Sequence, residues 1–439
     1  MKRSNRKRDR KYERGQILIL LAFVMIGLML CSALAIDVGF AYVTKARLGK
    51  AVDAACLLGM ANLAQGQGTA TTIATNTFSA NYPVTGLDAN APTVNVSFTT
   101  FNQQGNQQVV GVSATATIRT IFMGLLPGYR TLNVSASAQA LRGFLAMTVV
   151  LDRSGSMAGN GGQAALQSAA PTFVNYFNNI TDQVGMVSFA SNATIDFTIA
   201  NHFLDAGTGI PTKIAGLTFT GATFGPGGLT LAKAQEDSVV PQQGQNLVKV
   251  VVYFTDGLVN TIQTTLSCNG TPTLYNIGGY DINNDPNVGF FVPATGVQTY
   301  RYDGSSRWYT CDGSGNCNTQ TSTSCLRNDA GFTSAIDGTT KSFTRAHVTA
   351  DAQYQALQTA TATRAENPGV YIYSIGLGSS PSTTFLQQIA NDPASPTYDS
   401  TKPVGIAVFA PDCPSSTCTT ELQQVFQTIA AKILLRLIQ

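Results

Sequence analysis

Apolar residues follow several different patterns along the 439-residue chain, and the first is an unbroken apolar run at residues 17–36. This run contains no charged residue. A helix of that length measures about 30 Å, the thickness of the hydrocarbon layer of a bilayer. A helical pattern of small and charged residues then continues without a break to residue 61. We therefore predict one helix over residues 16–61, whose first part crosses a membrane as a single span.

The second pattern is an alternation of apolar and polar residues in short runs. It occurs at Val94–Phe98, Val109–Ile118 and Leu132–Ala138. Alternation of this kind is typical of half-buried strands, and residues 102–108 (NQQGNQQ) are predicted to form a hairpin turn. We expect a small β-rich module over residues 62–142.

Over residues 143–439, apolar strands alternate with helical patterns. The predicted strands are 144–151, 184–190, 247–255, 369–377 and 405–409, and the predicted helices are 163–179, 229–240, 347–366, 382–391 and 419–437. Pro171 is expected to start or kink the first of these helices. Such alternation predicts an α/β fold with a doubly wound, mostly parallel, Rossmann-like sheet. Ligands of such sheets bind beyond the carboxyl ends of the strands.

Residues 260–345 interrupt this domain with a stretch rich in Gly, Asn, Asp, Ser, Thr and Tyr that shows no clear period. A structureless loop of this length is unusual inside a compact domain, so we predict a disulfide-stapled insertion. It follows directly on the strand at 247–255 and is expected to overhang the edge of the sheet where that strand ends. Six cysteines lie in the C-terminal half: Cys268, Cys311, Cys317, Cys325, Cys413 and Cys418.

These cysteines favour disulfides in a segment placed outside the cytoplasm. Cys413 and Cys418 bracket a short stretch and could close a small loop, while the other four could form two bridges in an order that the sequence does not give. A zinc site is the alternative. However, Cys311, Cys317 and Cys325 are separated by five and seven residues, without the short spacing of a zinc knuckle.

The charge distribution indicates an orientation for the membrane span. Residues 1–15 hold eight Lys or Arg and two acids, so they form a basic tail that we expect to stay in the cytoplasm. The rest of the chain holds 19 basic and 22 acidic residues, which does not support a nucleic-acid-binding surface. A cleaved signal peptide ending at Ala33-Leu34-Ala35 and a buried core helix are the alternatives. The run is longer than the usual signal sequence, and a core helix needs no basic leader.

The strand at 144–151 is followed by Asp152, Ser154 and Ser156 at alternate positions. Two further candidates follow at Thr223, in a Gly-rich turn, and Asp256, after the strand at 247–255. Carboxylate and hydroxyl oxygens suit Mg2+, Mn2+ or Ca2+, not zinc or copper. The alternative interpretation is that Asp152 caps the next helix and the hydroxyls bind its free N–H groups.

This set resembles the metal-ion-dependent adhesion site (MIDAS) of von Willebrand factor A domains. The resemblance spans about residues 143–437, with 260–345 as an insertion, and implies the metal ligands Asp152, Ser154, Ser156, Thr223 and Asp256. The turn at Gly221-Ala222-Thr223 departs slightly from the family's G-G-T pattern. Because few anionic ligands touch such a metal directly, it can accept a carboxylate from a partner protein.

Catalytic motifs are not found in the sequence. A serine hydrolase needs a G-x-S-x-G elbow and a histidine, whereas Ser154 follows Arg153 and the chain has only His202 and His347. The Gly-rich turn also lacks the Lys of a phosphate-binding loop. We therefore expect a protein that is not an enzyme.

The N-terminal segment carries a second resemblance. Arg14-Gly15-Gln16, residues 35–39 (AIDVG) and residues 46–55 (ARLGKAVDAA) are similar to the TadE/TadG-like segment of Flp (tight adherence) pilus-assembly proteins. The fifth residue after Gly15 is Leu20 and not the Glu of prepilins, so we expect the segment to be retained as an anchor.

Together the resemblances imply a bacterial inner-membrane protein with a single span, a cytoplasmic N-terminus and domains in the periplasm or outside the cell. Its expected partners are other pilus-assembly proteins and a protein that supplies an acidic residue to the metal. The alternative is a surface adhesin that recognises host or matrix ligands directly, independently of pilus assembly.

Overall fold

The computed structural model describes most of the chain, apart from short gaps. The described residues are 13–63, 66–86, 88–101, 107–125, 127–159, 161–241, 246–268, 270–279, 288–304, 307–312, 316–321, 331–413 and 417–437. The basic tail lies outside these ranges up to residue 12, and so does most of the predicted hairpin turn at 102–108. Contacts within the chain divide it into two compact units, with the division between Arg142 and Gly143.

The first unit is built on one long helix, α1 (Glu13–Ala61). Its segment beginning at Ile17 is the one helix in the described ranges that is long and apolar enough to cross a membrane, with a mean hydropathy of 2.9. The apolar window of this helix is 0% buried. The run at 17–36 is therefore not the core helix of a soluble fold.

The C-terminal half of α1 packs against a second helix and a sheet. Leu48, Val52, Cys56 and Met60 are buried on α1, and the Cys56 thiol donates a hydrogen bond to the carbonyl oxygen of Val110 at 3.1 Å. The sheet has three antiparallel strands in the order β1-β2-β3. Its strands are β1 (Thr93–Phe101), β2 (Gln107–Arg119) and β3 (Thr131–Leu141), which agree with the predicted alternating runs.

Helix α2 (Gln67–Asn81) was not predicted from the sequence. Its residues are mostly Thr, Ser, Asn and Gly, which have weak helix propensity. Three positions spaced by four residues, Ala70, Ala74 and Phe78, are buried in the same core as the end of α1. Tertiary packing of this narrow stripe outweighs the unfavourable propensity, since most helical stability in proteins comes from such packing.

The second unit is built on a six-stranded sheet in the order β17-β16-β7-β4-β5-β6. Its strands are β4 (Phe144–Asp152), β5 (Gln183–Phe189), β6 (Ala193–Ala200), β7 (Leu247–Thr255), β16 (Val370–Leu377) and β17 (Ala407–Ala410). Neighbouring strands are parallel from β17 to β5, but β6 pairs with β5 antiparallel. Four of the five strand pairs are therefore parallel and one is antiparallel, so the sheet is mixed rather than purely parallel. Strand β6 escaped prediction because it is a half-exposed edge strand with a weak apolar pattern.

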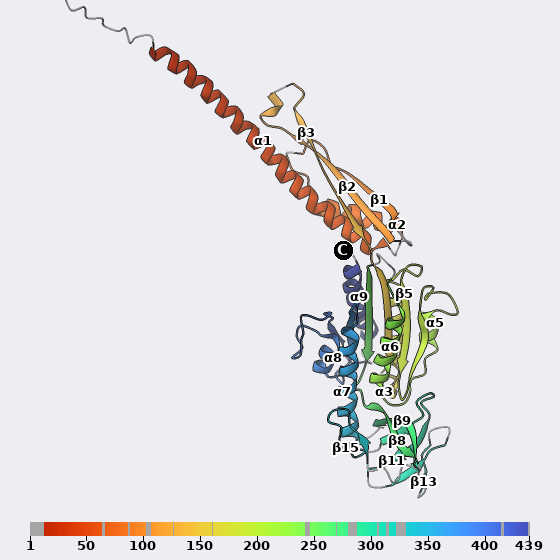
Figure 1. Cartoon of the computed structure of the whole chain (residues 1–439). Helices are drawn as coiled ribbons and strands as arrows, with labels where there is room; N and C mark the ends of the chain where they lie inside the picture. The colour runs from red at the N-terminus through yellow and green to blue at the C-terminus, as the bar shows by residue number, and fades with distance from the viewer. Residues whose placement is uncertain are drawn as a thin grey trace, which may run out of the picture. The chain divides into compact units, whose positions relative to one another are not determined.

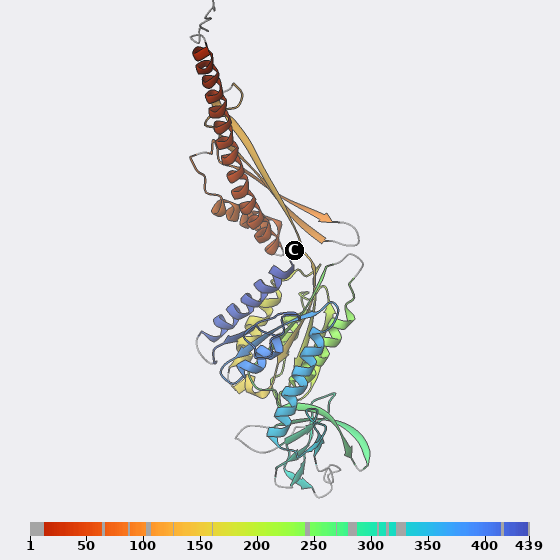
Figure 2. The same cartoon turned by 60° about the vertical axis from the view of Figure 1, so that its left-hand side comes forward.

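Helices cover both faces of this sheet, as Figures 1 and 2 show. On β4, Met147, Val149 and Leu151 face one core and Val150 faces the other. The first core contains α3 (Gly155–Gly159), α4 (Gly162–Val174), α5 (Ile210–Ala215) and α9 (Cys418–Leu437). The second contains α6 (Gly225–Ser238), α7 (Arg345–Arg364) and α8 (Thr383–Ala390). Pro171 lies inside α4 and does not start it.

The insertion at 260–345 forms mostly strands, which the sequence did not predict. An antiparallel sheet in the order β13-β12-β11-β10-β9-β8 contains β8 (Thr261–Cys268), β9 (Thr271–Gly279), β10 (Val288–Phe291), β11 (Gln298–Tyr302), β12 (Trp308–Thr310) and β13 (Thr319–Thr321). Two further short strands, β14 (Phe332–Thr333) and β15 (Thr340–Lys341), pair with each other. Phe290, Trp308 and Phe343 form an aromatic cluster beneath this sheet, with ring centroids 5.0 to 5.9 Å apart.

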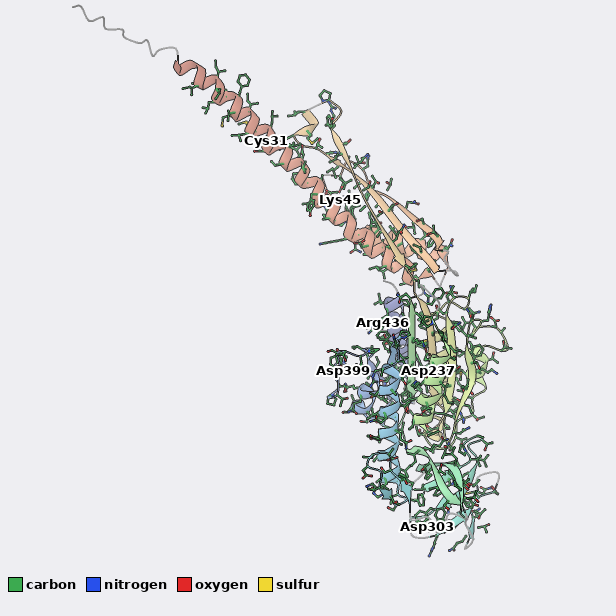
Figure 3. All side chains as sticks on the ribbon, in the orientation of Figure 1. Cys31, Lys45, Asp237, Asp303, Asp399 and Arg436 are labelled. Atoms are coloured by element: carbon green, nitrogen blue, oxygen red, sulfur yellow. A yellow bond between two sulfur atoms is a disulfide. The ribbon has the colours of Figure 1, made fainter. Side chains whose placement is uncertain are left out.

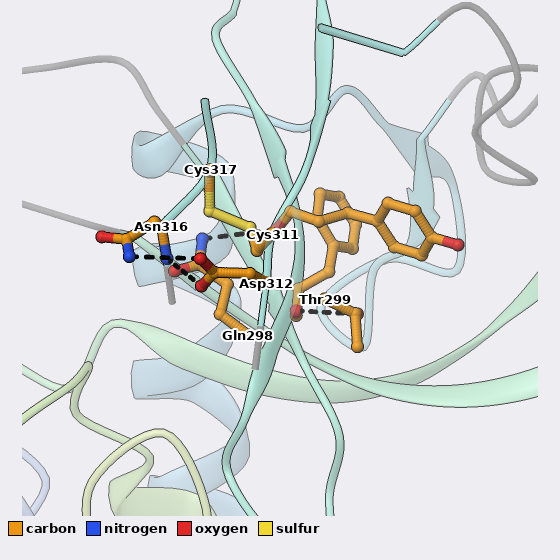
Figure 4. Close-up of a disulfide and its surroundings, with 8 residues drawn as sticks. Gln298, Thr299, Cys311, Asp312, Asn316 and Cys317 are labelled. Carbon is orange, nitrogen blue, oxygen red and sulfur yellow. Dashed lines mark hydrogen bonds between the residues drawn. A yellow bond between two sulfur atoms is a disulfide. The ribbon is translucent and has the colours of Figure 1, made fainter. Parts of the chain in front are cut away.

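Two disulfides are present in the described residues. Cys311 is bonded to Cys317, and Figure 4 shows this bridge beside the hydrogen bond that the Asn316 amide donates to Asp312 Oδ1 at 2.9 Å. Cys413 is bonded to Cys418, as their short separation predicted. The first bridge excludes the zinc alternative for Cys311 and Cys317, while Cys325 lies outside the described residues.

Candidate metal centre

Asp152 is the last residue of β4, at the point where the strand leaves the sheet. The strand is fully buried up to this residue, and the Asp152 side chain is 0% exposed. Its Oδ1 atom accepts a hydrogen bond from the Ser154 amide at 2.8 Å. This local bond resembles a helix cap, and α3 begins directly afterwards at Gly155. Capping of α3 involves only this oxygen and does not explain the position of the second carboxylate oxygen, Oδ2.

The second oxygen, Asp152 Oδ2, accepts a hydrogen bond from the Thr255 hydroxyl at 2.6 Å. Thr255 is the last residue of β7, which lies next to β4 with Leu151 opposite Phe254. The hydroxyl of Thr255 thus holds the Asp152 carboxylate from the neighbouring strand. Sequence reasoning missed this residue, although it directly precedes Asp256 in the T-D-G triplet.

The two serines connect Asp152 to Asp256. Ser154 Oγ lies 3.1 Å from Ser156 Oγ, and the Ser156 hydroxyl donates a hydrogen bond to Asp256 Oδ1 at 2.8 Å. The carboxyl ends of parallel strands β4 and β7 meet at one edge, so residues a hundred positions apart in sequence come into contact. Ser154 is buried and Ser156 is exposed, so this cluster opens to solvent at Ser156.

Thr223 lies on a third segment, whose backbone is tied to the first. The Gly155 amide donates to the carbonyl oxygen of Gly221 at 3.0 Å. The Thr223 amide donates to Asn260 Oδ1 at 2.8 Å, and the Asn260 amide returns a bond to the Thr223 carbonyl oxygen at 3.1 Å. Asn260, like Thr255, was not among the predicted residues. Its side chain accepts a bond from the same turn whose Gly221 carbonyl oxygen binds the serine loop.

The turn at Gly221 requires glycine. Its φ of +90° is a conformation that side-chain-bearing residues rarely adopt, and an added Cβ would lie 2.4 Å from Ser191 Oγ. That hydroxyl accepts a hydrogen bond from the Ala222 amide at 3.0 Å. The departure from the family's G-G-T pattern therefore falls at Ala222, and the glycine that the backbone needs is retained.

The site concentrates negative charge in a buried place. Burial and, secondly, the nearby Asp152 carboxylate together raise the pKa of Asp256 to about 7, against the lowering effect of the bond from Ser156. Burial also raises the pKa of Asp152, against the hydrogen bonds from Ser154 and Thr255. Asp256 Oδ2 is buried and has no hydrogen-bond partner among the described residues. A cation placed between the two carboxylates would offset the free-energy cost of burying their negative charges and would bind Oδ2 of Asp256.

The donor set fits a hard divalent cation. It consists of two carboxylates and three hydroxyl side chains, and all of its ligand atoms are oxygen, as Mg2+, Mn2+ and Ca2+ prefer. In the described ranges, no group of three or more His, Cys, Asp and Glu side chains lies together in a way that could hold a metal ion.

The insertion is joined to the loops that form this site. Asn276 on β9 donates from Nδ2 to the Ser191 carbonyl oxygen at 2.9 Å. The Gly279 amide donates to the carbonyl oxygen of Asn260 at 3.0 Å. These bonds place the insertion at the edge of the sheet where β7 ends, as its position in the sequence predicted.

Comparison with solved structures finds only distant similarity. Proximal thread matrix protein 1 from the mussel byssus is 16% identical with a TM-score of 0.34, and the match covers 67% of this chain and 47% of that one. Another structure of the mussel protein has a zinc-occupied MIDAS motif. The PilB minor pilin from Streptococcus sanguinis is 14% identical with a TM-score of 0.37, and the match covers 79% of each chain. This chain thus spans about half the length of the mussel protein.

Comparison with protein families is more specific. No curated protein sequence matches the chain. Residues 147–269 match the von Willebrand factor type A domain, and this match includes all five predicted metal ligands. Residues 15–62 match the Flp pilus-assembly TadE/G-like domain, which includes most of α1. The chain therefore carries a von Willebrand factor type A domain and, ahead of it, a TadE/G-like Flp pilus-assembly domain.

Proposed function

We propose that Asp152, Ser154, Ser156, Thr223 and Asp256 bind a divalent cation, most simply Mg2+, through which the protein binds an acidic group of a partner protein. The observation that carries this proposal is the junction of the strand ends of β4 and β7. There Ser156 donates to Asp256 Oδ1 at 2.8 Å while Asp256 Oδ2 is buried and has no partner within the described part of the chain. A bound cation would supply the missing interaction.

The donor set accounts for partner binding in a simple way. Three of the five candidate ligands are neutral hydroxyls, so the cation keeps much of its positive charge. A carboxylate from another protein would complete the coordination with a charge-assisted contact, and the surrounding loops would provide contact area. This is a binding function, and it needs no nucleophile or general base.

The cellular role is proposed from the two domains together. Helix α1 would anchor the protein in the bacterial inner membrane through residues 17–36, with the basic residues before it in the cytoplasm. The von Willebrand A domain would then lie in the periplasm or outside the cell. The TadE/G-like match supports the proposal that this partner binding serves the assembly or anchoring of a Flp pilus.

Thermal unfolding of the full chain with and without Mg2+ tests the cation site. A ligand at a hundred times its Kd stabilises the folded state by about 2.7 kcal/mol. Wild type should therefore melt at a higher temperature when Mg2+ is added. Asp256→Asn should lose most of this shift, and Asp205→Asn, which removes an exposed carboxylate of the same unit, should keep it. An equal Mg2+ shift in both variants would contradict the proposed site.

A second candidate function is direct adhesion to host or matrix ligands through the insertion. The observation that favours it is the hydrogen bond from Asn276 of the insertion to the Ser191 carbonyl oxygen, which puts a second surface beside the candidate cation site. Leu258 and Val297 are large apolar residues exposed in this region. If the double variant Leu258→Ser, Val297→Ser loses adhesion but assembles pili, adhesion is the function. If it retains both, this candidate is excluded.

A further inference from the structure

The connection between β2 and β3 ends in a compact apolar tip at residues 120–130. Its short helix, η2 (Met123–Leu125), is followed by a turn in which Gly128 has a φ of +91°. Four large side chains of the tip are exposed to solvent: Ile121 (51%), Phe122 (41%), Leu125 (84%) and Tyr129 (54%). Exposed apolar residues grouped in this way mark an interaction surface.

The tip is fixed to α1 by Asp37. Its carboxylate accepts three backbone hydrogen bonds, from Ile121 at 2.8 Å, Phe122 at 3.0 Å and Met123 at 2.6 Å. The Asp37 side chain is buried beneath the tip. Three amides that bind one carboxylate define the position of the tip along the helix.

Asp37 is also the first residue after the apolar run at 17–36. At a rise of 1.5 Å per residue, it lies about 1.5 Å beyond the end of that run. Figure 3 labels Cys31 and Lys45, which lie on α1 on either side of Asp37 in sequence, and the tip lies beside this stretch. The exposed apolar side chains are therefore at the depth where the proposed span would leave the hydrocarbon layer.

The backbone of the tip is held in place by its own hydrogen bonds. The Thr120 amide donates to the carbonyl oxygen of Arg130 at 3.2 Å, and the Thr120 hydroxyl donates to the carbonyl oxygen of Tyr129 at 2.5 Å. The ladder between β2 and β3 reaches the pair Arg119 and Thr131 at its base. Because the backbone of the tip is already ordered, binding through its apolar side chains would cost little conformational entropy.

We propose that this tip inserts into the interfacial region of the same bilayer that α1 crosses. The proposal rests on the membrane span of the proposed function and adds a second point of contact with the lipid. Arg119 and Arg130 are exposed at the two ends of the tip, and no acidic residue occurs between them. Arginine binds lipid phosphates well, and tyrosine is favoured at the boundary between hydrocarbon and water.

Two contacts with the bilayer, one by α1 and one by the tip, would restrict the orientation of the first unit more than α1 alone. A lone span can tilt and rotate within a bilayer, and its orientation is set by anchoring groups at the interface. With the tip inserted, the first unit would have a defined depth and rotation relative to the membrane. We assign this surface to lipid. The following test would show if a protein binds there instead.

The test uses the full chain in nanodiscs of phosphatidylcholine and phosphatidylglycerol, with acyl chains brominated near the headgroup as quenchers. Three single variants each add a tryptophan: Leu125→Trp in the tip, Phe23→Trp in the span, and Val84→Trp as the control. The emission of wild type, which contains the single Trp308, is subtracted. Val84 is exposed like Leu125. Pro83, next to Val84, accepts a hydrogen bond from Arg47 of α1. By helical rise, Arg47 lies about 15 Å further from the apolar run than Asp37 does, so the control tryptophan lies away from the proposed bilayer.

The proposal predicts that brominated lipid quenches Leu125→Trp strongly, with a blue-shifted emission, while Val84→Trp keeps its emission. Equal quenching of Leu125→Trp and Val84→Trp would overturn it. A second result would also overturn the proposal: brominated lipid leaves the Leu125→Trp emission unchanged, and aqueous iodide does not quench it either. Such a result would assign the tip to a contact with a protein. Phe23→Trp distinguishes a failure of the proposed membrane span from a failure of the proposed tip insertion. If brominated lipid does not quench Phe23→Trp, the proposed span is wrong. If it quenches Phe23→Trp but not Leu125→Trp, only the proposed insertion of the tip is wrong.

Discussion

At the scale of single residues, the candidate site depends on two buried carboxylates that the fold brings together. The charge of Arg153 favours the ionised form of Asp152, against the effect of burial on its pKa. Asp152 accepts hydrogen bonds from Ser154 and Thr255 on both oxygens. Asp256 has one oxygen bound to Ser156 and one that no described residue binds. The side chain of Arg153, the nearest basic residue in sequence, binds Ser188 and Asn192. The imbalance between the two carboxylates is what a bound cation would relieve.

This imbalance predicts the pH dependence of cation binding. Asp256 must be ionised to bind the cation, and its pKa of about 7 means that protons compete below that pH. The affinity for Mn2+ should therefore fall by up to about tenfold for each pH unit below 7, and should be nearly constant above about pH 8. Mn2+ titrations at several pH values measure this. An affinity that is the same at about pH 5.5 and about pH 7.5 would contradict the prediction.

Thr255 provides a test of how Asp152 is positioned. Thr255→Val replaces the hydroxyl that donates to Asp152 Oδ2 by a methyl group of similar size. Groups that orient a metal ligand typically contribute tenfold to a hundredfold in affinity, so Mn2+ binding should weaken by about that factor. Thr212→Val, at an exposed position on α5, is the matched control. If both variants bind Mn2+ as wild type does, Thr255 has no positioning role.

Sequence reasoning found the five candidate ligands because each lies where a strong apolar strand or a Gly-rich turn ends. Asp152 ends the buried strand β4 and Asp256 directly follows β7, and the parallel pairing of the two strands brings their ends together. Thr255 and Asn260 were missed because a threonine in a strand and an asparagine in a loop are common. Only the folded structure shows that their side chains bind Asp152 and the amide of Thr223.

At the scale of elements, long apolar strands and helices were predictable, whereas elements stabilised by tertiary contacts were not. The β4 and β7 strands coincide closely with their predicted ranges. Helix α2 depends on a three-residue buried stripe, and the insertion sheet consists of short strands around an aromatic cluster. Their local sequences resemble loops, because the residues that stabilise them are distant in the sequence.

Helix α6 and strand β4 are joined by a buried Glu236 that should affect stability. The Thr148 hydroxyl donates to Glu236 Oε1 at 2.7 Å, and Lys249 Nζ donates to the Glu236 backbone carbonyl oxygen at 2.6 Å. Burial raises the pKa of Glu236 from 4.5 to about 8. The folded state therefore holds a proton that the unfolded state releases above pH 4.5.

The free energy of unfolding should accordingly fall as the pH rises from about 4.5 to about 8, because the folded pKa is raised. The upper limit of this loss is roughly 5 kcal/mol, at about 1.4 kcal/mol per unit. Glu236→Gln keeps an acceptor for Thr148 but does not titrate, so its stability should vary less over this range. Urea unfolding at a series of pH values, at constant Mg2+, measures the difference. Parallel curves for the two proteins would show that Glu236 is ionised in the folded state.

At the scale of the whole molecule, the two domains assign different tasks to different parts of the chain. The TadE/G-like domain includes the apolar part of α1, which is exposed and suited to lipid. The von Willebrand A domain contains the candidate cation site, with the insertion hydrogen-bonded to one of its loops. A protein with this arrangement is suited to hold a partner at the cell envelope.

The central claim is that one divalent cation binds where β4 and β7 end. Electron paramagnetic resonance of Mn2+ added to the full chain tests it most directly, because bound and free Mn2+ give different spectra. The account predicts a single bound Mn2+ per chain in wild type, which Mg2+ displaces and which Asp152→Asn abolishes without unfolding the domain. The account is contradicted if wild type leaves all Mn2+ free, or if Asp152→Asn binds it as tightly as wild type.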